Sequence, residues 1–199
     1  MGILERKIRH RQEVRDRILQ AAWQLVELEG WSALSIRRIA DAIEYSIPVI
    51  YSHFENKDAI LLEFSREGFR RLAQHLQTAR DEQDNPGQQL MAMAQAYWNF
   101  AFDNQEFYQL MFGLGIPACD TVKKVAEMKQ FSDVIFPVLQ QAIATSSHPE
   151  TSHLLKFHTF WSILHGLVSI QMIGKDNATD PIQQLVLEDA IGGFIKALA

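Results

Sequence analysis

Side chains capable of catalysis are present in this 199-residue chain, but they lack the partners that an enzyme site needs. Tyr108, Cys119 and His158 are the candidates that could host chemistry beside an apolar pocket. The chain has no G-x-S-x-G nucleophile elbow, no phosphate-binding glycine loop and no H-E-x-x-H metal motif, and Cys119 has no identifiable base. We therefore expect that the chain is not an enzyme.

The histidines do not suggest a metal site either. The four at positions 148, 153, 158 and 165 are spaced by five, five and seven residues, whereas paired ligands on a helix share one face. His165 lies four residues after Trp161, where packing with a hydrogen bond is the better explanation. We expect no metal and no cofactor.

The formal net charge of -5 hides an asymmetry between the two halves of the chain. Residues 1–80 carry a net charge of +2, and residues 81–199 carry a net charge of -7. A polyanion would therefore bind the basic N-terminal end, where Arg9 and Arg11 lie within a cluster of cations. A frayed, solvated terminus explains the same charges without a partner.

No membrane segment is indicated. The chain has no twenty-residue uncharged apolar run, and its first seventeen residues lack the apolar stretch and cleavage site of a secretory signal. We expect a cytoplasmic protein without a membrane partner.

Apolar residues recur with helical spacing nearly throughout, and no segment alternates as a strand would. The spacing predicts an all-α fold of about nine helices. The first is a long helix that ends at Gly30, with an apolar face of Val14, Ile18, Ala21, Ala22, Leu25 and Leu28. Two short helices follow, capped by Ser35 and Ser46, and the others are expected over 57–81, 87–102, 105–112, 120–145, 149–173 and 181–198, with loops at 113–117 and 174–181.

The two short helices have the arrangement of a helix-turn-helix motif. Helices of two turns need a packing partner, and the long helices on either side can supply it. The second short helix would then project its outer face into a DNA major groove; that face comprises Ser46, Ile47, Val49, Tyr51, Ser52 and His53. Short helices that only connect a bundle are the alternative.

Residues in fixed register strengthen the DNA-binding interpretation. The stretches 17–22, 30–31, 34–40, 45–46, 50–54 and 57–58 resemble the DNA-binding domain of the TetR family of transcriptional regulators. Residues 96–101, 106–113 and 161–166 resemble the ligand domain of one subgroup, and the last of these resembles the signature of the WHG-type C-terminal domain.

The resemblance implies a three-helix DNA-binding domain over 1–56 and a ligand-binding and dimerisation domain over 57–199, linked by the helix 57–81. It further implies a homodimer on a palindromic DNA operator, from which a small apolar ligand releases it. A regulator without an effector and a ligand that acts as corepressor are the alternatives.

Residue roles follow from the same resemblance. Lys57 matches a lysine that contacts a phosphate at a helix N-terminus, and Tyr51 and His53 match residues that lie against the DNA backbone. Arg37 matches a residue that can reach a base edge, although a solvated arginine is the alternative. The expected DNA contacts are Arg9, Arg11, Arg37, Arg38, Ser46, Ile47, Pro48, Val49, Tyr51, Ser52, His53 and Lys57.

Two features depart from the family pattern. Glu44 stands where the family usually has a turn glycine, so a left-handed backbone there would carry strain of about 1–2 kcal/mol. The outer face of the second short helix has no Arg, Lys, Asn or Gln, so we expect Ile47 and Val49 to contact thymine methyl groups.

Aromatic residues are concentrated in the second half, where 13 of the 20 lie after residue 81. Such residues usually form core, but a wall of rings and thioethers can also accept an apolar ligand. The expected pocket lining is Trp98, Phe102, Met111, Phe112, Phe131 and His158. The expected dimer surface on the last two helices is Leu154, Phe157, Trp161, Leu164, Val168, Ile182, Leu185, Val186, Gly193 and Phe194.

Overall fold

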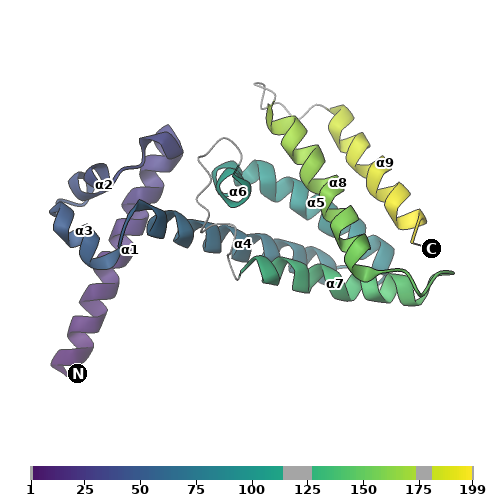
Figure 1. Cartoon of the computed structure of the whole chain (residues 1–199), viewed down its shortest axis with the longest axis horizontal. Coiled ribbons are helices and arrows are strands. Elements are labelled where there is room, and N and C mark those ends of the chain that lie inside the picture. Colours follow the sequence, from purple (N-terminus) through teal and green to yellow (C-terminus); the bar gives the residue numbers. More distant parts are fainter. Residues whose placement is uncertain (1, 114–126, 174–180, 199) are drawn as a thin grey trace.

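The structure is a computed structural model that describes residues 2–113, 127–173 and 181–198. In those residues it has nine α-helices and one short 3-10 helix, which confirms the all-α prediction. The elements are α1 (Ile3–Glu29), η1 (Trp31–Ala33), α2 (Ile36–Ala42), α3 (Ile47–His53), α4 (Lys57–Asp81), α5 (Pro86–Asp103), α6 (Gln105–Phe112), α7 (Met128–Ala144), α8 (His153–Ile173) and α9 (Pro181–Lys196). Figure 1 shows α1, α2 and α3 at one end of the molecule, with α4 running from them into the layer of later helices.

The short helices α2 and α3 are held by a small shared core with α1 and α4. Ile39 and Ile50 are completely buried, and they pack in one cluster with Ile18 of α1 and Ile60 of α4. This burial replaces the stability that helices of seven residues lack by themselves. On α1, however, the prediction was wrong for Leu28, which is 80% exposed, because the buried stripe of the last turn passes through Val26 instead.

Local capping ends or starts the helices where the sequence predicted. Gly30 ends α1 with a left-handed φ of 76°, and Ser35 accepts a hydrogen bond from the Arg38 N–H at the start of α2. Asn56 caps α4 in the same way through the Ala59 N–H, at 2.9 Å. Ser46 is the N-cap residue of α3, although its side chain accepts no capping hydrogen bond there.

The turn between α2 and α3 is a Schellman motif that places Glu44 in a glycine position. The Tyr45 N–H donates to the Ala40 carbonyl at 3.0 Å, and the Glu44 N–H donates to the Asp41 carbonyl at 3.3 Å. This pattern requires a left-handed residue after the helix, and Glu44 accordingly has a φ of 58°. It is the one non-glycine residue with positive φ in the described part of the chain.

The C-terminal helices pack around α4 and α5. The long α4 contacts α5, α6 and α7, while α8 packs against α7 and α9. Helix α8 begins at His153 rather than at 149, because the Ser152 hydroxyl accepts the Leu155 N–H and acts as its N-terminal cap. Helix α9 ends at Lys196 rather than at 198.

Some sequence predictions lie outside the described residues. These are Cys119, the start of the helix expected over 120–145, and most of the two expected loops. Within the described residues, no helix is long and apolar enough to cross a bilayer. The same residues contain no cluster of three or more His, Cys, Asp or Glu side chains that could hold a metal ion.

We expect Glu44→Gly to stabilise the protein by up to about 1 kcal/mol. Removing Cβ relieves left-handed strain of about 1–2 kcal/mol, and the added freedom of the unfolded chain offsets part of this gain. Urea unfolding at one protein concentration measures the difference. Glu44→Ala is the matched control, because it removes the carboxylate but keeps Cβ; equal stability of the two variants would contradict the strain argument.

Candidate functional site: a DNA-binding surface and an aromatic interior

The outer face of α3, together with residue 46, forms an exposed surface at the N-terminal end of the molecule. Ile47 and Tyr51 are 40% and 52% exposed, although both are large apolar or aromatic side chains. Ser46, Pro48 and Ser52 are exposed as well, and Ile50 on the opposite face is completely buried. Helix α3 can therefore be inserted into a groove while its inner face remains in the core.

Val49 differs from Ile47 in its surroundings. It is half-buried and packs against the core cluster, so only part of its side chain is available to DNA. Of the two aliphatic residues expected to contact thymine methyl groups, Ile47 is the more accessible.

Arginines of α1 form hydrogen bonds with α3 and with the turn between α2 and α3. Arg11 donates to the Ser52 carbonyl at 3.1 Å, and Arg17 donates to the Ile43 carbonyl at 3.3 Å. The Arg15 guanidinium lies 4.9 Å from the centre of the Phe54 ring and forms a 3.0 Å ion pair with Glu63. Part of the N-terminal positive charge thus stabilises the fold instead of forming a freely solvated terminus.

His53 lies at the end of α3 beside these cations. Its Nδ1 atom is buried and forms no hydrogen bond with any described residue. Burial lowers the pKa of His53, and the positive charges of Arg11, Arg15 and His10 lower it further. A nearby anion such as a DNA phosphate would oppose these effects and supply an acceptor.

The two arginines of α2 have different environments. Arg37 is 82% exposed, and its guanidinium lies 4.0 Å from the Asp41 carboxylate. Arg38 is bound by Glu29, with a 2.9 Å hydrogen bond, and this bond lowers the pKa of Glu29. Arg37 is therefore the better placed to contact a base, while Arg38 has a structural partner.

The interior of the C-terminal domain contains a chain of hydrogen-bonded polar side chains. The hydroxyls of Tyr97 on α5 and Tyr108 on α6 are 2.9 Å apart, and the Tyr108 hydroxyl lies 2.7 Å from Nδ1 of His165 on α8. The His165 Nε2 atom lies 3.5 Å from the Ser169 hydroxyl. Sequence reasoning placed His165 in a packed, hydrogen-bonded role and named Tyr108 beside an apolar pocket, but it gave Tyr97 no role and did not find their hydrogen bonds.

The residues expected to line a pocket fall into separate groups. Phe112 and Phe131 both lie about 6 Å from the Trp161 ring, which is close to the polar chain. Trp98 instead pairs with Phe102 at 4.8 Å.

The other two expected lining residues are at the edges of this interior. Met111 lies so close to Gly68 of α4 that a Cβ added there would be 2.5 Å from its sulfur. His158 is exposed, next to the Phe157 ring. The assignment of these side chains to one pocket stays a prediction.

The expected dimer surface divides between interior and exterior. Phe157, Leu164, Val168 and Phe194 are buried within the protomer and leave little surface for a partner, so their place in a dimer contact stays a prediction. Helical periodicity cannot distinguish core residues from interface residues, because both are apolar. The remaining residues are exposed or half-buried: Leu154, Trp161, Ile182, Leu185, Val186 and Gly193.

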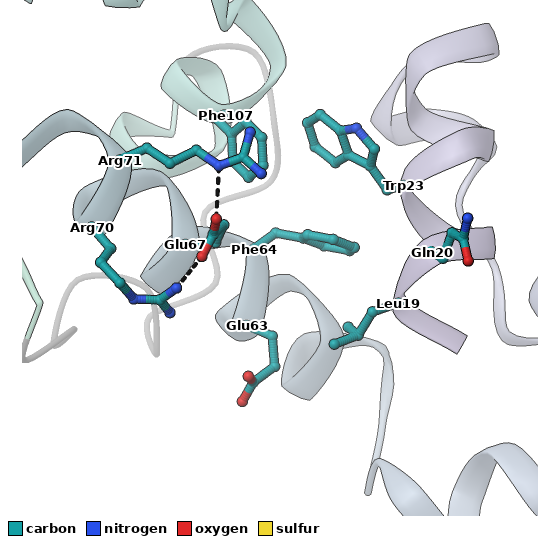
Figure 2. Close-up of a pocket in the computed structure, with 9 residues that line it drawn as sticks. All are labelled: Leu19, Gln20, Trp23, Glu63, Phe64, Glu67, Arg70, Arg71 and Phe107. Carbon is teal, nitrogen blue, oxygen red and sulfur yellow. Dashed lines mark hydrogen bonds and ion pairs between the residues drawn. The ribbon is translucent and has the colours of Figure 1, made fainter. Parts of the chain in front are cut away.

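An open groove of about 370 Å³ lies where the DNA-binding end meets the C-terminal domain (Figure 2). The rings of Trp23 from α1, Phe64 from α4 and Phe107 from α6 point toward one another there. Trp23 stacks on Phe107 at 4.1 Å between ring centres, and the Arg71 guanidinium lies 4.8 Å from the same Phe107 ring. The Trp31 indole N–H also donates to the Glu106 carbonyl at 3.0 Å, so α6 is bound directly to the DNA-binding end.

Two protein-family models match the chain. Residues 18–64 match the model described as "Bacterial regulatory proteins, tetR family". Residues 90–189 match the model described as "Tetracyclin repressor-like, C-terminal domain". The search of curated proteins found no match.

Solved structures share the fold over nearly the whole chain. A protein of unknown function from a Rhodococcus species has a TM-score of 0.76 at 24% identity, covering 93% of this chain and 95% of its own. The TetR family transcriptional regulator PfmR from Thermus thermophilus has a TM-score of 0.65 at 20% identity, covering 90% of this chain and 97% of its own. The transcriptional regulator FadR from Bacillus subtilis, solved with stearoyl-CoA, has a TM-score of 0.70 at 17% identity, covering 89% of this chain and 97% of its own.

We expect Lys57→Gln to weaken binding to any DNA duplex about equally and to lower the salt slope of affinity by about one. Lys57 is the first residue of α4, where the helix N-terminus adds partial positive charge to its ammonium group. Fluorescence anisotropy over a series of salt concentrations measures the slope. Lys129→Gln on α7 removes an exposed charge from the other domain, and an equal loss in both variants would contradict the phosphate contact.

We expect Ile47→Ala to relax the preference for thymine at one or two operator positions, by about 1 kcal/mol each. The exposed side chain of Ile47 can contact a thymine methyl, and its loss leaves the core intact. Selection of binding sites from randomised DNA measures base preference. A preference profile identical to that of the unmodified protein would exclude this contact.

Proposed function

We propose, because the chain belongs to the TetR family of transcriptional regulators, that it is a homodimeric repressor. Proteins of this family act by binding DNA and not by catalysis. In the proposal, a small apolar ligand releases the dimer from a palindromic operator. The observation that carries the DNA-binding part is α3, which is exposed on one face and anchored by Ile50 on the other. We place this activity in the cytoplasm. We also propose that the C-terminal domain is of the WHG type, which residues 161–166 resemble.

The exposed apolar residues of α8 and α9 support dimerisation. Leu154 and Leu185 are 58% and 57% exposed, and Leu155 and Ile170 are exposed to a similar extent. Exposed apolar residues gathered on two adjacent helices are typical of a protein interface. A two-fold axis there would present two copies of α3 to successive major grooves.

The aromatic interior supports an apolar ligand. The rings around Trp161 offer dispersion contacts and no charge, which suits a hydrocarbon or aromatic body. The fold relative FadR from Bacillus subtilis was solved with stearoyl-CoA, and a long acyl chain belongs to this chemical class.

Helix α6 supports the coupling between ligand and DNA. Its consecutive residues Phe107 and Tyr108 have opposite partners, since Phe107 stacks on Trp23 of α1 and Tyr108 bonds to His165 of α8. A ligand that displaces Tyr108 would therefore also displace Phe107. Coupling of this kind is commonly about 1–3 kcal/mol, which changes operator affinity about 5- to 150-fold.

Footprinting on DNA that flanks the encoding gene tests the function. We expect protection of a sequence with two-fold symmetry. Fatty acids, acyl-CoA thioesters and aromatic ketones are then added one at a time, and the compound that is the effector should abolish this protection. Tighter protection with a compound would identify a corepressor instead. No protection of any site would contradict the proposal.

We expect Leu185→Glu to raise the dimer dissociation constant at least about tenfold, because a carboxylate buried without a partner opposes association. Sedimentation velocity over a range of concentrations measures it. Leu28→Glu changes an exposed leucine on α1 and is the matched control. Equal dissociation constants for the two variants would place the dimer contact elsewhere.

A further inference from the structure

The polar chain in the C-terminal interior leaves one buried donor without an acceptor. The indole N–H of Trp161 is shielded from solvent and forms no hydrogen bond with any described residue. It lies near the Tyr97 hydroxyl, where it partly offsets the rise in the pKa of Tyr97 that burial causes. Buried polar groups nearly always have a hydrogen-bond partner, so an orphan donor in such a network calls for an explanation.

The protonation states of the neighbours decide which polar groups near Trp161 can accept a hydrogen bond. Burial raises the pKa of both Tyr97 and Tyr108, and it lowers the pKa of His165, so all three are neutral near pH 7. If His165 Nδ1 accepts, Tyr108 donates to it and Tyr97 donates to Tyr108, so the Tyr97 oxygen can still accept. In the other tautomer His165 donates to Tyr108 and Tyr108 donates to Tyr97, so the Tyr97 O–H is a second donor without an acceptor. In neither arrangement does the Trp161 N–H reach hydrogen-bond geometry with a described residue.

We propose that Trp161, Tyr97, Tyr108 and His165 form the polar end of the ligand site, and that this end binds a neutral apolar molecule whose carbonyl oxygen accepts the Trp161 N–H. The inference rests on the proposed function, because it identifies the chemical class of the effector. The rings of Phe112 and Phe131, which flank Trp161, would contact the apolar body of the molecule.

The surroundings favour a neutral ligand over a carboxylate. Among the described residues, no Lys or Arg side chain forms a hydrogen bond, ion pair or ring contact with any member of this group. A carboxylate here would lose its hydration without gaining a counter-charge, whereas a carbonyl needs only one or two donors. When His165 carries its proton on Nδ1, the Tyr97 O–H is free, so the Trp161 N–H and the Tyr97 hydroxyl can both donate to the same oxygen.

The position of this polar end also suits an effector. Tyr108 and Phe112 are on α6, the helix that contacts Trp23 and Trp31 at the DNA-binding end. A carbonyl that competes for the Tyr97 and Tyr108 hydroxyls would change the hydrogen bonds holding α6 to α5 and α8. Recognition of the ligand and movement of α6 would then involve the same atoms.

A matched pair of probes tests the inference on the full-length protein. Butyrophenone and butylbenzene have nearly the same size and shape, but only the first has a carbonyl oxygen. With protein labelled with nitrogen-15, titration followed by NMR detects the indole N–H signals of the four tryptophans. We expect butyrophenone to bind about five- to tenfold more tightly, as one added hydrogen bond implies, and to shift the Trp161 signal downfield.

Two variants make the result specific. Trp161→Phe should remove the preference for the ketone and still bind both probes, because the ring that packs against them is kept. Trp98→Phe removes an indole that pairs with Phe102, and it should keep the preference. Loss of the preference in both variants would indicate a general change of structure and overturn the assignment.

The outcomes separate this inference from the proposed function. Equal binding of both probes, or a Trp161 signal that the ketone leaves unchanged, overturns the carbonyl site while apolar ligand binding stands. Failure of both probes to bind up to their solubility limit overturns it as well. Footprinting then decides independently whether the protein is an operator-binding repressor.

Discussion

The stacking of Phe107 on Trp23 fixes α6 against α1, and together with the continuous helix α4 it sets how the two ends of the molecule are arranged. It joins α6 to α1 at 4.1 Å, and the Trp31 to Glu106 hydrogen bond and the Arg71 cation over Phe107 reinforce it. An aromatic pair of this kind contributes about 0.5–1.5 kcal/mol beyond the area it buries. That is the same order as a typical coupling free energy between sites, which agrees with the proposed role of this contact in coupling ligand to DNA.

Local chemistry explains why much of the fold could be predicted from the sequence. Asn56 at the start of α4 and Gly30 at the end of α1 act through their own backbone neighbours, so their roles do not depend on tertiary structure. Leu28 shows the limit of this reasoning. It continues the apolar spacing of α1, but periodicity did not reveal that the buried face of the last turn runs through Val26.

The interior site could not be predicted because its members come from different helices. Tyr97, Tyr108 and His165 are on α5, α6 and α8, and only tertiary packing brings their polar atoms together. The same limit applies to the surface of α8, where buried Phe157 and exposed Leu154 are three residues apart and equally apolar. Composition showed that the second half of the chain is rich in aromatic residues. Its buried hydrogen bonds form only where three helices meet, which composition does not show.

The charge distribution has a different meaning once the contacts of α1 are known. Arg11 and Arg17 bind carbonyls at the end of α3 and in its turn, so the N-terminal cations position the recognition surface as well as attract DNA. A DNA-binding half with a net charge of only +2 then has few cations for phosphates. We therefore expect weak non-specific affinity, and we propose that the shape of α3 and the exposed side chains of Ile47 and Arg37 select the operator. The net charge of -7 on residues 81–199 acts in the same direction, because it disfavours binding of DNA to that half of the chain.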